Sequence, residues 1–263
     1  MKKLLIIGSG GYIGRNLRKL FLKDSEYVLH ELKNRKDLNL NKTEDVINFF
    51  SKFQYDYIIN LTGQYANSAN DFASINSLGN INLVNALKKS GSKDTKIIFF
   101  STTLVYGNTT KITSEKGVAK PIGNYALSKY EGEQILMKSK YNTLILRVAN
   151  VYDNKFLKKG LLKNIVESVD NKTQIKINNL KSYSNYIHIN DLCKFVYSLV
   201  KKNTQFTKKI INVGNENLSI KQIIFLFEEL LDINIKTSNA KYSGASISQK
   251  IDVTNFNKTD ESV

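Results

Sequence analysis

The sequence predicts an α/β protein with a doubly wound parallel sheet. Short apolar runs recur along the first 150 residues, and each is followed by a segment whose apolar residues have helical spacing. The first run stops at a cluster of glycines, and the chain contains one proline. Buried strands that alternate with amphipathic helices are typical of a parallel sheet covered by helices on both faces.

Each predicted element rests on its own pattern. Uninterrupted apolar runs predict buried strands, and apolar residues three or four positions apart predict helices. The predicted strands of the first half are 3–7, 27–32, 57–61, 97–100 and 143–148. The predicted helices there are 13–21, 43–50, 75–87 and 125–137, the second of them capped by Thr43.

The alternation loosens beyond Asn150, where the chain changes its pattern without any linker-like stretch or internal repeat. Helices are predicted at 157–169, 191–200 and 220–231, with short strands near Ile175 and Ile211. The stretch from roughly residue 239 onward is polar and is predicted to be irregular.

Composition excludes several classes of function. The single cysteine, Cys193, excludes an internal disulfide framework and a cysteine-based zinc site. Neither His30 nor His188 has a partner at ligand spacing, so no metal site is predicted. No apolar run approaches the roughly 20 residues of a membrane span, and the start of the chain does not resemble an export signal, so we expect no membrane association and a cytoplasmic location.

The net charge of +16 raises the question of nucleic-acid binding. The lysines are spread along the chain, and their clusters are pairs near predicted helix ends, where cations suit the helix dipole. Nucleic acid is therefore not a predicted partner, although an anionic small substrate would gain from this field.

A glycine-rich turn follows the first predicted strand. Gly8, Gly11 and Gly14 are spaced so that a phosphate group can approach the backbone, and Tyr12 and Ile13 open the helix behind them. The start of that helix supplies unpaired N–H groups and a partial positive charge. This arrangement predicts that the turn holds the pyrophosphate of a dinucleotide.

At several places the chain resembles the extended short-chain dehydrogenase/reductase family, of the NAD-dependent epimerase/dehydratase type. The matching segments are Gly8-x-x-Gly11-x-x-Gly14, Asn60-Leu61-Thr62-Gly63, Ser101-Thr102-Thr103-Leu104-Val105-Tyr106-Gly107, Tyr125-Ala126-Leu127-Ser128-Lys129, Leu146–Tyr152, Tyr186–Asp191 and Asn212-Val213-Gly214. They cover roughly residues 3–230. The resemblance implies a Rossmann-type dinucleotide-binding domain over residues 1–150. It also implies a smaller, interleaved C-terminal substrate-binding part over residues 151–263.

The resemblance also implies site residues. The catalytic residues would be Thr102, Tyr125 and Lys129. The cofactor would contact Gly8, Gly11, Tyr12, Ile13, Gly14, Asp37, Leu38, Leu61, Thr62, Gly63, Asn76, Tyr125 and Lys129. The substrate, a nucleotide-linked sugar, would contact Thr103, Asn150 and Tyr152, with Asp153 standing where related enzymes often have glycine.

Two Tyr-x-x-x-Lys pairs occur, Tyr125/Lys129 and Tyr197/Lys201, and the spacing alone does not distinguish them. Tyr125 and Lys129 lie one helical turn apart and follow the strand that carries Thr102, whereas Tyr197 lies among apolar residues of a late helix. We therefore predict that Tyr125 transfers the proton that accompanies hydride transfer. A lysine ammonium near a phenol favours its ionised form and lowers its pKa.

The reaction is narrowed by two features. Family dehydratases carry Asp-Glu directly after the catalytic threonine, where this chain has Thr103 and Leu104, which disfavours dehydration. Arg35 in the run Lys33-Asn34-Arg35-Lys36 would suit the 2′-phosphate of NADP and favours a 4-ketoreductase of keto-deoxysugars; the alternative is that this run is a solvated basic loop. NAD is the alternative cofactor if Glu31 holds the ribose hydroxyls, a question that the strand register decides.

Other functions stay open at this point. One alternative is an epimerase with tightly bound NAD, and another is a non-catalytic redox-sensing or RNA-binding member of the fold. A homodimer is expected through the helices around 72–90 and 124–139, because Phe72, Ile81, Ile135 and Met137 extend their apolar surface beyond one stripe.

Overall fold

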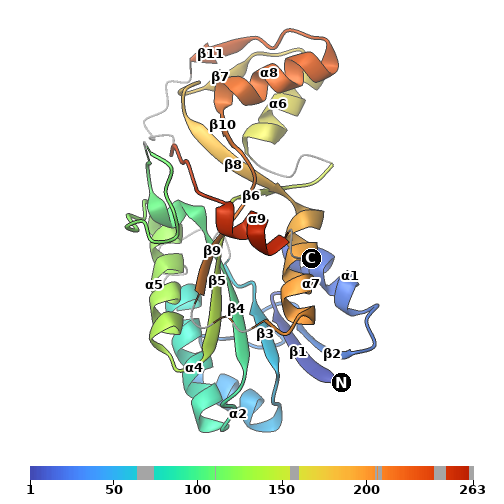
Figure 1. Cartoon of the computed structure of the whole chain (residues 1–263), viewed down its shortest axis with the longest axis vertical. Helices are drawn as coiled ribbons and strands as arrows, with labels where there is room; N and C mark the ends of the chain where they lie inside the picture. The colour runs from blue at the N-terminus through green and yellow to red at the C-terminus, as the bar shows by residue number, and fades with distance from the viewer. Residues whose placement is uncertain are drawn as a thin grey trace.

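The computed structural model has a large lower part built on a parallel sheet and a smaller upper lobe (Figure 1). It describes residues 1–63, 74–109, 111–154, 160–204, 206, 209–239 and 247–260. Phe72, one of the residues predicted to extend the dimer surface, lies outside the described residues.

The central sheet is six-stranded, parallel and ordered β2-β1-β3-β4-β5-β9, which confirms the predicted fold class. Its strands are β1 (Lys2–Ile7), β2 (Tyr27–Leu32), β3 (Tyr57–Asn60), β4 (Lys96–Thr102), β5 (Asn142–Val148) and β9 (Lys209–Val213). The order reverses between β1 and β3, and open α/β sheets bind ligands at such a switch point, beyond the carboxyl ends of the strands.

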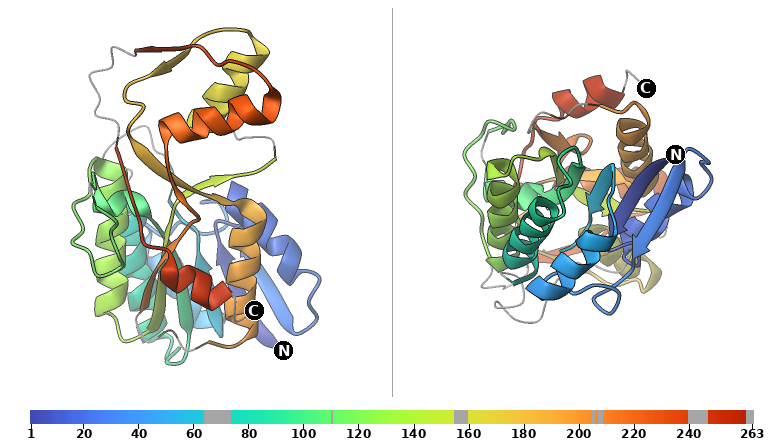
Figure 2. Two further views of the ribbon diagram at one scale, coloured as in Figure 1. Left: turned by 45° about the horizontal axis from the view of Figure 1, so that its top comes forward. Right: turned by 90° about the horizontal axis from the view of Figure 1, so that it is seen from below.

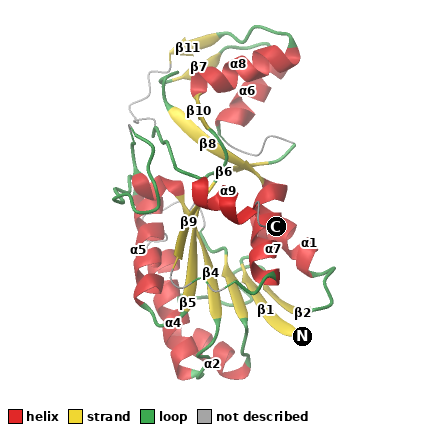
Figure 3. Cartoon of the chain, in the orientation of Figure 1, coloured by secondary structure: helices red, strands yellow, loops and turns green. Residues whose placement is uncertain are grey.

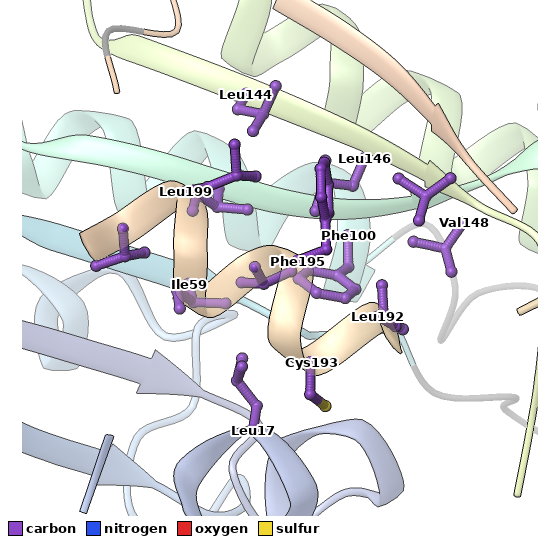
Figure 4. Close-up of a cluster of buried hydrophobic side chains, with 14 of the residues drawn as sticks. Leu17, Ile59, Phe100, Leu144, Leu146, Val148, Leu192, Cys193, Phe195 and Leu199 are labelled. Atoms are coloured by element: carbon purple, nitrogen blue, oxygen red, sulfur yellow. The ribbon is translucent and has the colours of Figure 1, made fainter. Parts of the chain in front are cut away.

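Helices cover both faces of this sheet (Figure 2). The helices are α1 (Tyr12–Phe21) and α7 (Ile189–Lys201) on one face, and α2 (Thr43–Lys52), α4 (Gly79–Lys89) and α5 (Asn124–Lys138) on the other. In Figure 4, Phe195 and Leu199 of α7 face Phe100 and Leu146 of the sheet. Cys193 is buried in the same cluster, next to Leu17 of α1 in that view, as a small core residue.

The upper lobe has its own small sheets and helices (Figure 3). Its elements are β6 (Asn150–Tyr152), α6 (Leu161–Asp170), β7 (Ile175–Ile177), β8 (Tyr183–His188), β10 (Asn217–Ser219), α8 (Ile220–Leu231) and β11 (Thr237–Asn239). The strands form one sheet of order β10-β8-β6 and a pair β11-β7. A separate apolar cluster, which includes Ile165 and Ile223, joins the two helices to these strands.

Several details differ from the sequence predictions. Thr43 is not the cap of α2: Lys42 holds that position without a side-chain bond, and the Thr43 hydroxyl donates to Asn82 Oδ1 at 3.1 Å. The helix predicted at 75–87 begins as a π-helical turn, η1 (Ser74–Leu78), before α4. The strands β6, β8, β10 and β11 were not predicted: β6, β10 and β11 are three residues long, and the six residues of β8 mix polar with apolar side chains.

The C-terminal stretch was also wrongly predicted as irregular. Residues 248–252 run extended beside the segment that follows β4, with a bridge between Thr113 and Ile251. The helix α9 (Thr254–Asp260) then packs Phe256 against Phe195 of α7, with ring centroids 4.8 Å apart. The prediction failed because the stretch has few apolar residues, although two of them, Ile251 and Phe256, are buried.

No described helix is both long enough and apolar enough to cross a membrane.

Candidate active site

A cavity of about 670 Å³ opens beyond the carboxyl ends of β1, β2 and β3. We call it the glycine-turn cavity; its lining includes the predicted cofactor residues Gly8, Gly11, Arg35, Leu38, Leu61, Thr62 and Gly63. Three other predicted cofactor residues do not line this cavity. They form the first turn of α1, directly behind its wall: Tyr12, Ile13 and Gly14. The cavity therefore lies at the switch point of the sheet, and seven of the residues predicted to contact the cofactor line it.

The local structure of this cavity suits a dinucleotide. Gly11 caps α1 and has no side chain to accept from the first N–H groups of the helix, which leaves them available to an anion. Gly14 has to be glycine, because a β-carbon there would overlap the Gly8 carbonyl oxygen. Asn76 is fully buried and donates to Ser128 Oγ at 3.0 Å, but its Oδ1 has no hydrogen-bond partner among the described residues. A buried oxygen of this kind normally has a donor, and a bound cofactor would supply one.

Asp37 organises the basic loop at the mouth of this cavity. Its carboxylate Oδ2 accepts from the backbone N–H groups of Lys33 at 2.5 Å and Asn34 at 3.1 Å. Asp37 does not line the glycine-turn cavity, whereas Arg35 and Lys36 do. The structure thus shows Asp37 shaping the loop from within, a contact that spacing alone did not predict.

Glu31 does not face the glycine-turn cavity. In the β1–β2 register Glu31 pairs with Ile6 and Leu32 with Ile7, and Leu32 lines the cavity. The Glu31 carboxylate instead accepts from Arg18 Nε at 2.5 Å and Nη2 at 2.9 Å on α1, and this partner lowers the pKa of Glu31. The acidic residue that could have held ribose hydroxyls is therefore bound elsewhere.

Lys129 lies directly behind the cavity wall, with 2% of its surface exposed. Its ammonium donates to the carbonyl oxygens of Thr62 and, at 2.7 Å, Phe100. Burial lowers the pKa of Lys129 to about 7, although the Glu133 carboxylate favours the charged form. Gly63 has a φ of +152°, and a β-carbon there would overlap this ammonium, so the position favours glycine.

Thr102 ends β4, and Tyr125 and Lys129 lie in the first half of α5. Thr102 is 7% exposed, and its Oγ1 accepts from the Leu104 N–H at 3.3 Å, which caps the 3-10 turn η2 (Thr103–Tyr106). A hydroxyl that accepts one bond can still donate its proton. Tyr125 is half-buried one turn before Lys129, and the Lys129–Phe100 bond ties α5 to the end of β4. The predicted trio thus comes from adjoining elements.

A buried ion pair supports this arrangement and was missed by the sequence analysis. Arg147 of β5 and Glu133 of α5 are 3% and 0% exposed, with Nη2 and Oε2 2.7 Å apart. Glu133 also accepts from Ser101 Oγ at 2.5 Å, and the guanidinium lies 4.7 Å from the centre of the Tyr106 ring. A charged residue four positions after Lys129 was visible in the sequence, but its partner was not.

The predicted substrate residues are placed differently from one another. Thr103 is 5% exposed, and its hydroxyl donates to Gln249 Oε1 at 3.1 Å. Asn150 is exposed and donates to the Asn185 carbonyl at 3.1 Å. Tyr152 lines a second cavity, of about 890 Å³.

We call this second space the tyrosine cavity; its lining includes Tyr152, Tyr183, Tyr186, Asn215, Asn217 and Lys250. Sequence analysis missed most of these residues. The tyrosines of β8 could have been noted as aromatic residues around the matched segment that begins at Tyr186, but Lys250 carried no signal. Thr102, Tyr125 and Lys129 line neither this cavity nor the glycine-turn cavity.

The second Tyr-x-x-x-Lys pair is structural, as predicted. On α7, the Tyr197 hydroxyl donates to Asp24 Oδ2 at 2.6 Å, and the Lys201 ammonium lies 2.8 Å from the same atom and 2.7 Å from Glu26 Oε1. Both histidines also make bonds within the fold, His30 with Tyr55 and His188 with the first turn of α7.

Comparison with known proteins agrees with this geometry. Residues 4–214 match the model of the NAD dependent epimerase/dehydratase family. The GDP-6-deoxy-D-talose 4-dehydrogenase of Aggregatibacter actinomycetemcomitans is 28% identical over 207 residues, which are 76% of this chain and 70% of the relative.

Solved structures show the same fold. The enzyme WbmG of Bordetella bronchiseptica, in complex with NAD, has a TM-score of 0.81 at 19% identity, covering 99% of this chain and 88% of the other. RMD from Pseudomonas aeruginosa, complexed with NADPH, has a TM-score of 0.79 at 17% identity, covering 99% and 93%. With the family model matching most of its length, the chain belongs to the NAD-dependent epimerase/dehydratase family of enzymes.

Proposed function

We propose that this enzyme is an NADPH-dependent 4-ketoreductase that acts on a nucleotide-linked keto-deoxysugar. The observation that carries the proposal is the opposite placement of two side chains at the end of β2. Glu31 is bound to Arg18 outside the glycine-turn cavity, while Arg35 lines the cavity itself. A planar guanidinium is well suited to a 2′-phosphate, and the relative named as a 4-dehydrogenase of a GDP-linked deoxysugar supports the substrate class.

The residues of the site have distinct tasks in this reaction. NADPH would be held by the glycine turn and Arg35, and when bound it would supply the hydride for the carbonyl carbon of the sugar. Tyr125 gives its phenolic proton to the carbonyl oxygen, which yields the alcohol, and Lys129 stabilises the phenolate that remains. Thr102 orients the substrate oxygen by donating a hydrogen bond.

Neighbouring residues favour reduction over the dehydration found in the same family. A dehydration needs an acid and a base beside the threonine, and this chain has the hydroxyl of Thr103, held by Gln249, and the apolar Leu104. An epimerase would keep its cofactor bound and oxidised through each cycle. A basic cavity mouth that recognises a 2′-phosphate is better suited to a cofactor that is exchanged.

Cofactor titration tests the proposal. NADPH should bind wild type more tightly than NADH, and Arg35→Ala should reduce this preference by about ten- to hundredfold, since a charged hydrogen bond contributes roughly 1.5–3 kcal/mol. Lys23→Ala, which removes the same charge from an exposed position outside the cavity, should leave the preference unchanged. Equal affinities of wild type for NADPH and NADH would show that Arg35 does not bind the 2′-phosphate.

Substrate turnover is the second arm of the test. GDP- and dTDP-linked 4-keto-6-deoxysugars should be reduced with stoichiometric oxidation of NADPH. Interconversion of 4-epimers by enzyme with retained NAD, without net oxidation of cofactor, would establish the epimerase alternative instead. We further propose a role in polysaccharide biosynthesis, together with the expected cytoplasmic location and homodimer.

A further inference from the structure

Residues 248–252 form an extended segment whose alternate side chains face opposite ways. Lys250 lines the tyrosine cavity, with its ammonium 3.8 Å from the centre of the Tyr183 ring. Gln249 and Ile251, on either side of it, are 6% and 1% exposed and point into the protein. The segment therefore forms part of the cavity wall on one side and part of the core on the other.

The buried Gln249 amide holds the turn that follows Thr102. Its Nε2 donates to the carbonyl oxygens of Thr103 at 2.8 Å and Gly107 at 3.0 Å, and its Oε1 accepts from Thr103 Oγ1 at 3.1 Å. Thr103 and Gly107 bracket η2, the turn that Thr102 caps. One side chain thus fixes both ends of the turn on which the placement of the Thr102 hydroxyl depends.

The backbone of the same segment is bonded to the wall of the tyrosine cavity. The Gln249 N–H donates to the Tyr183 carbonyl at 2.9 Å, and the Tyr183 N–H donates to Ser248 Oγ at 3.0 Å. The Ile251 N–H donates to Asn217 Oδ1 at 2.8 Å. Tyr183 and Asn217 both line the cavity, so the segment is bonded directly to the cavity wall.

We propose that Gln249 is a positioning residue that couples a nucleoside diphosphate bound in the tyrosine cavity to the placement of Thr102. The inference rests on the proposed function, in which Thr102 meets the sugar of the substrate, and adds that the tyrosine cavity takes the nucleotide part. Lys250 supplies the cation for the diphosphate, and the tyrosine rings supply flat apolar surface for the base. Misplacement of a reacting group by about 1 Å can cost on the order of a hundredfold in rate, so a link of this kind favours turnover of the complete substrate.

Hydrogen exchange tests the link without any need for catalysis. Addition of GDP or dTDP to wild type should slow amide exchange across Leu104–Gly107. In Gln249→Ala the same nucleotide should still protect the cavity wall around Tyr183 but should no longer protect the turn. Asn108→Ala removes the 2.8 Å bond that the Ser248 N–H donates to Asn108 Oδ1 and leaves the bonds of Gln249 in place; it is the control and should behave as wild type.

Kinetics provide the second readout. Gln249→Ala should lower kcat for the nucleotide-linked ketosugar by about ten- to a hundredfold, with the affinity for NADPH unchanged. For the same ketosugar as its 1-phosphate, which lacks the nucleoside, wild type and variant should differ by less than about threefold. An equal loss of kcat on both substrates would mark Gln249 as merely structural.

The exchange data separate the two ideas. Nucleotide-dependent protection of Leu104–Gly107 that persists in Gln249→Ala, or is absent from wild type, would overturn the coupling whatever reaction the enzyme performs. Failure of wild type to reduce any 4-keto nucleotide sugar would overturn the proposed function alone.

Discussion

Replacing Lys129 by methionine removes a buried cation while keeping most of its volume, and the effect on stability should depend on pH. Burial lowers the pKa of Lys129 from 10.5 to about 7 in the folded enzyme. Between these values the unfolded chain holds a proton that the folded chain has released, so stability rises with pH. One pKa unit corresponds to about 1.4 kcal/mol, and from pH 7 to pH 9 the rise works out at roughly 2 kcal/mol.

The free energy of unfolding, measured by urea denaturation of cofactor-free protein at pH 7, 8 and 9, tests this value. Wild type should gain about 2 kcal/mol relative to Lys129→Met over that range. Lys201→Met is the matched control: its bonds to Asp24 and Glu26 raise the pKa of Lys201, so it stays protonated in both states and its difference from wild type should be flat. A flat difference for Lys129→Met as well would refute the reasoning and show that water or a counter-charge reaches the ammonium.

Three further outcomes are expected. Tyr125→Phe should lower kcat at least about 10²-fold, while Tyr197→Phe should change it little; the reverse order would show that the wrong pair was assigned. Glu133→Ala leaves the Arg147 charge buried without its partner and should lower the free energy of unfolding, measured in urea, by about 3–5 kcal/mol. A loss below about 1 kcal/mol would mean that water solvates the Arg147 guanidinium in the variant. Sedimentation at micromolar concentration should show a dimer that Ile81→Asp, at a 41% exposed position of α4, converts to monomer; a monomeric wild type would contradict the helix-bundle interface.

The sequence was most informative where structure is local. The strand, glycine turn and helix over residues 2–21 follow from apolar runs and from glycines whose spacing a tight turn requires. Tyr125 and Lys129 could be chosen over Tyr197 and Lys201 because their position after Thr102 is encoded in chain order. The cofactor residues were also assigned from motifs that are local in the chain, and seven of them line the glycine-turn cavity.

Contacts between distant segments could not be predicted in this way. Arg18 binds Glu31 only because α1 packs beside β2, and the register that turns Glu31 away from the cavity differs by one residue from the register that would admit it. Gln249 looked like part of an irregular polar stretch, since its role depends on a turn 146 residues earlier in the chain. A single polar residue that acts through its hydrogen bonds produces no periodic pattern in the sequence, so periodicity cannot reveal it.

The last strand of the central sheet has a consequence for how the protein is made. β9 pairs with β5 and is reached only after the chain has passed through β6, α6, β7 and β8 of the upper lobe and through α7. From the point at which β5 has left the ribosome until β9 has been made, the strands β2-β1-β3-β4-β5 form an incomplete sheet whose edge, β5, is open and apolar. Unpaired edges of this kind recruit other strands, so premature termination in this interval would release a product prone to aggregation. Slow codons or chaperone binding would therefore matter most between the completion of β5 and the synthesis of β9.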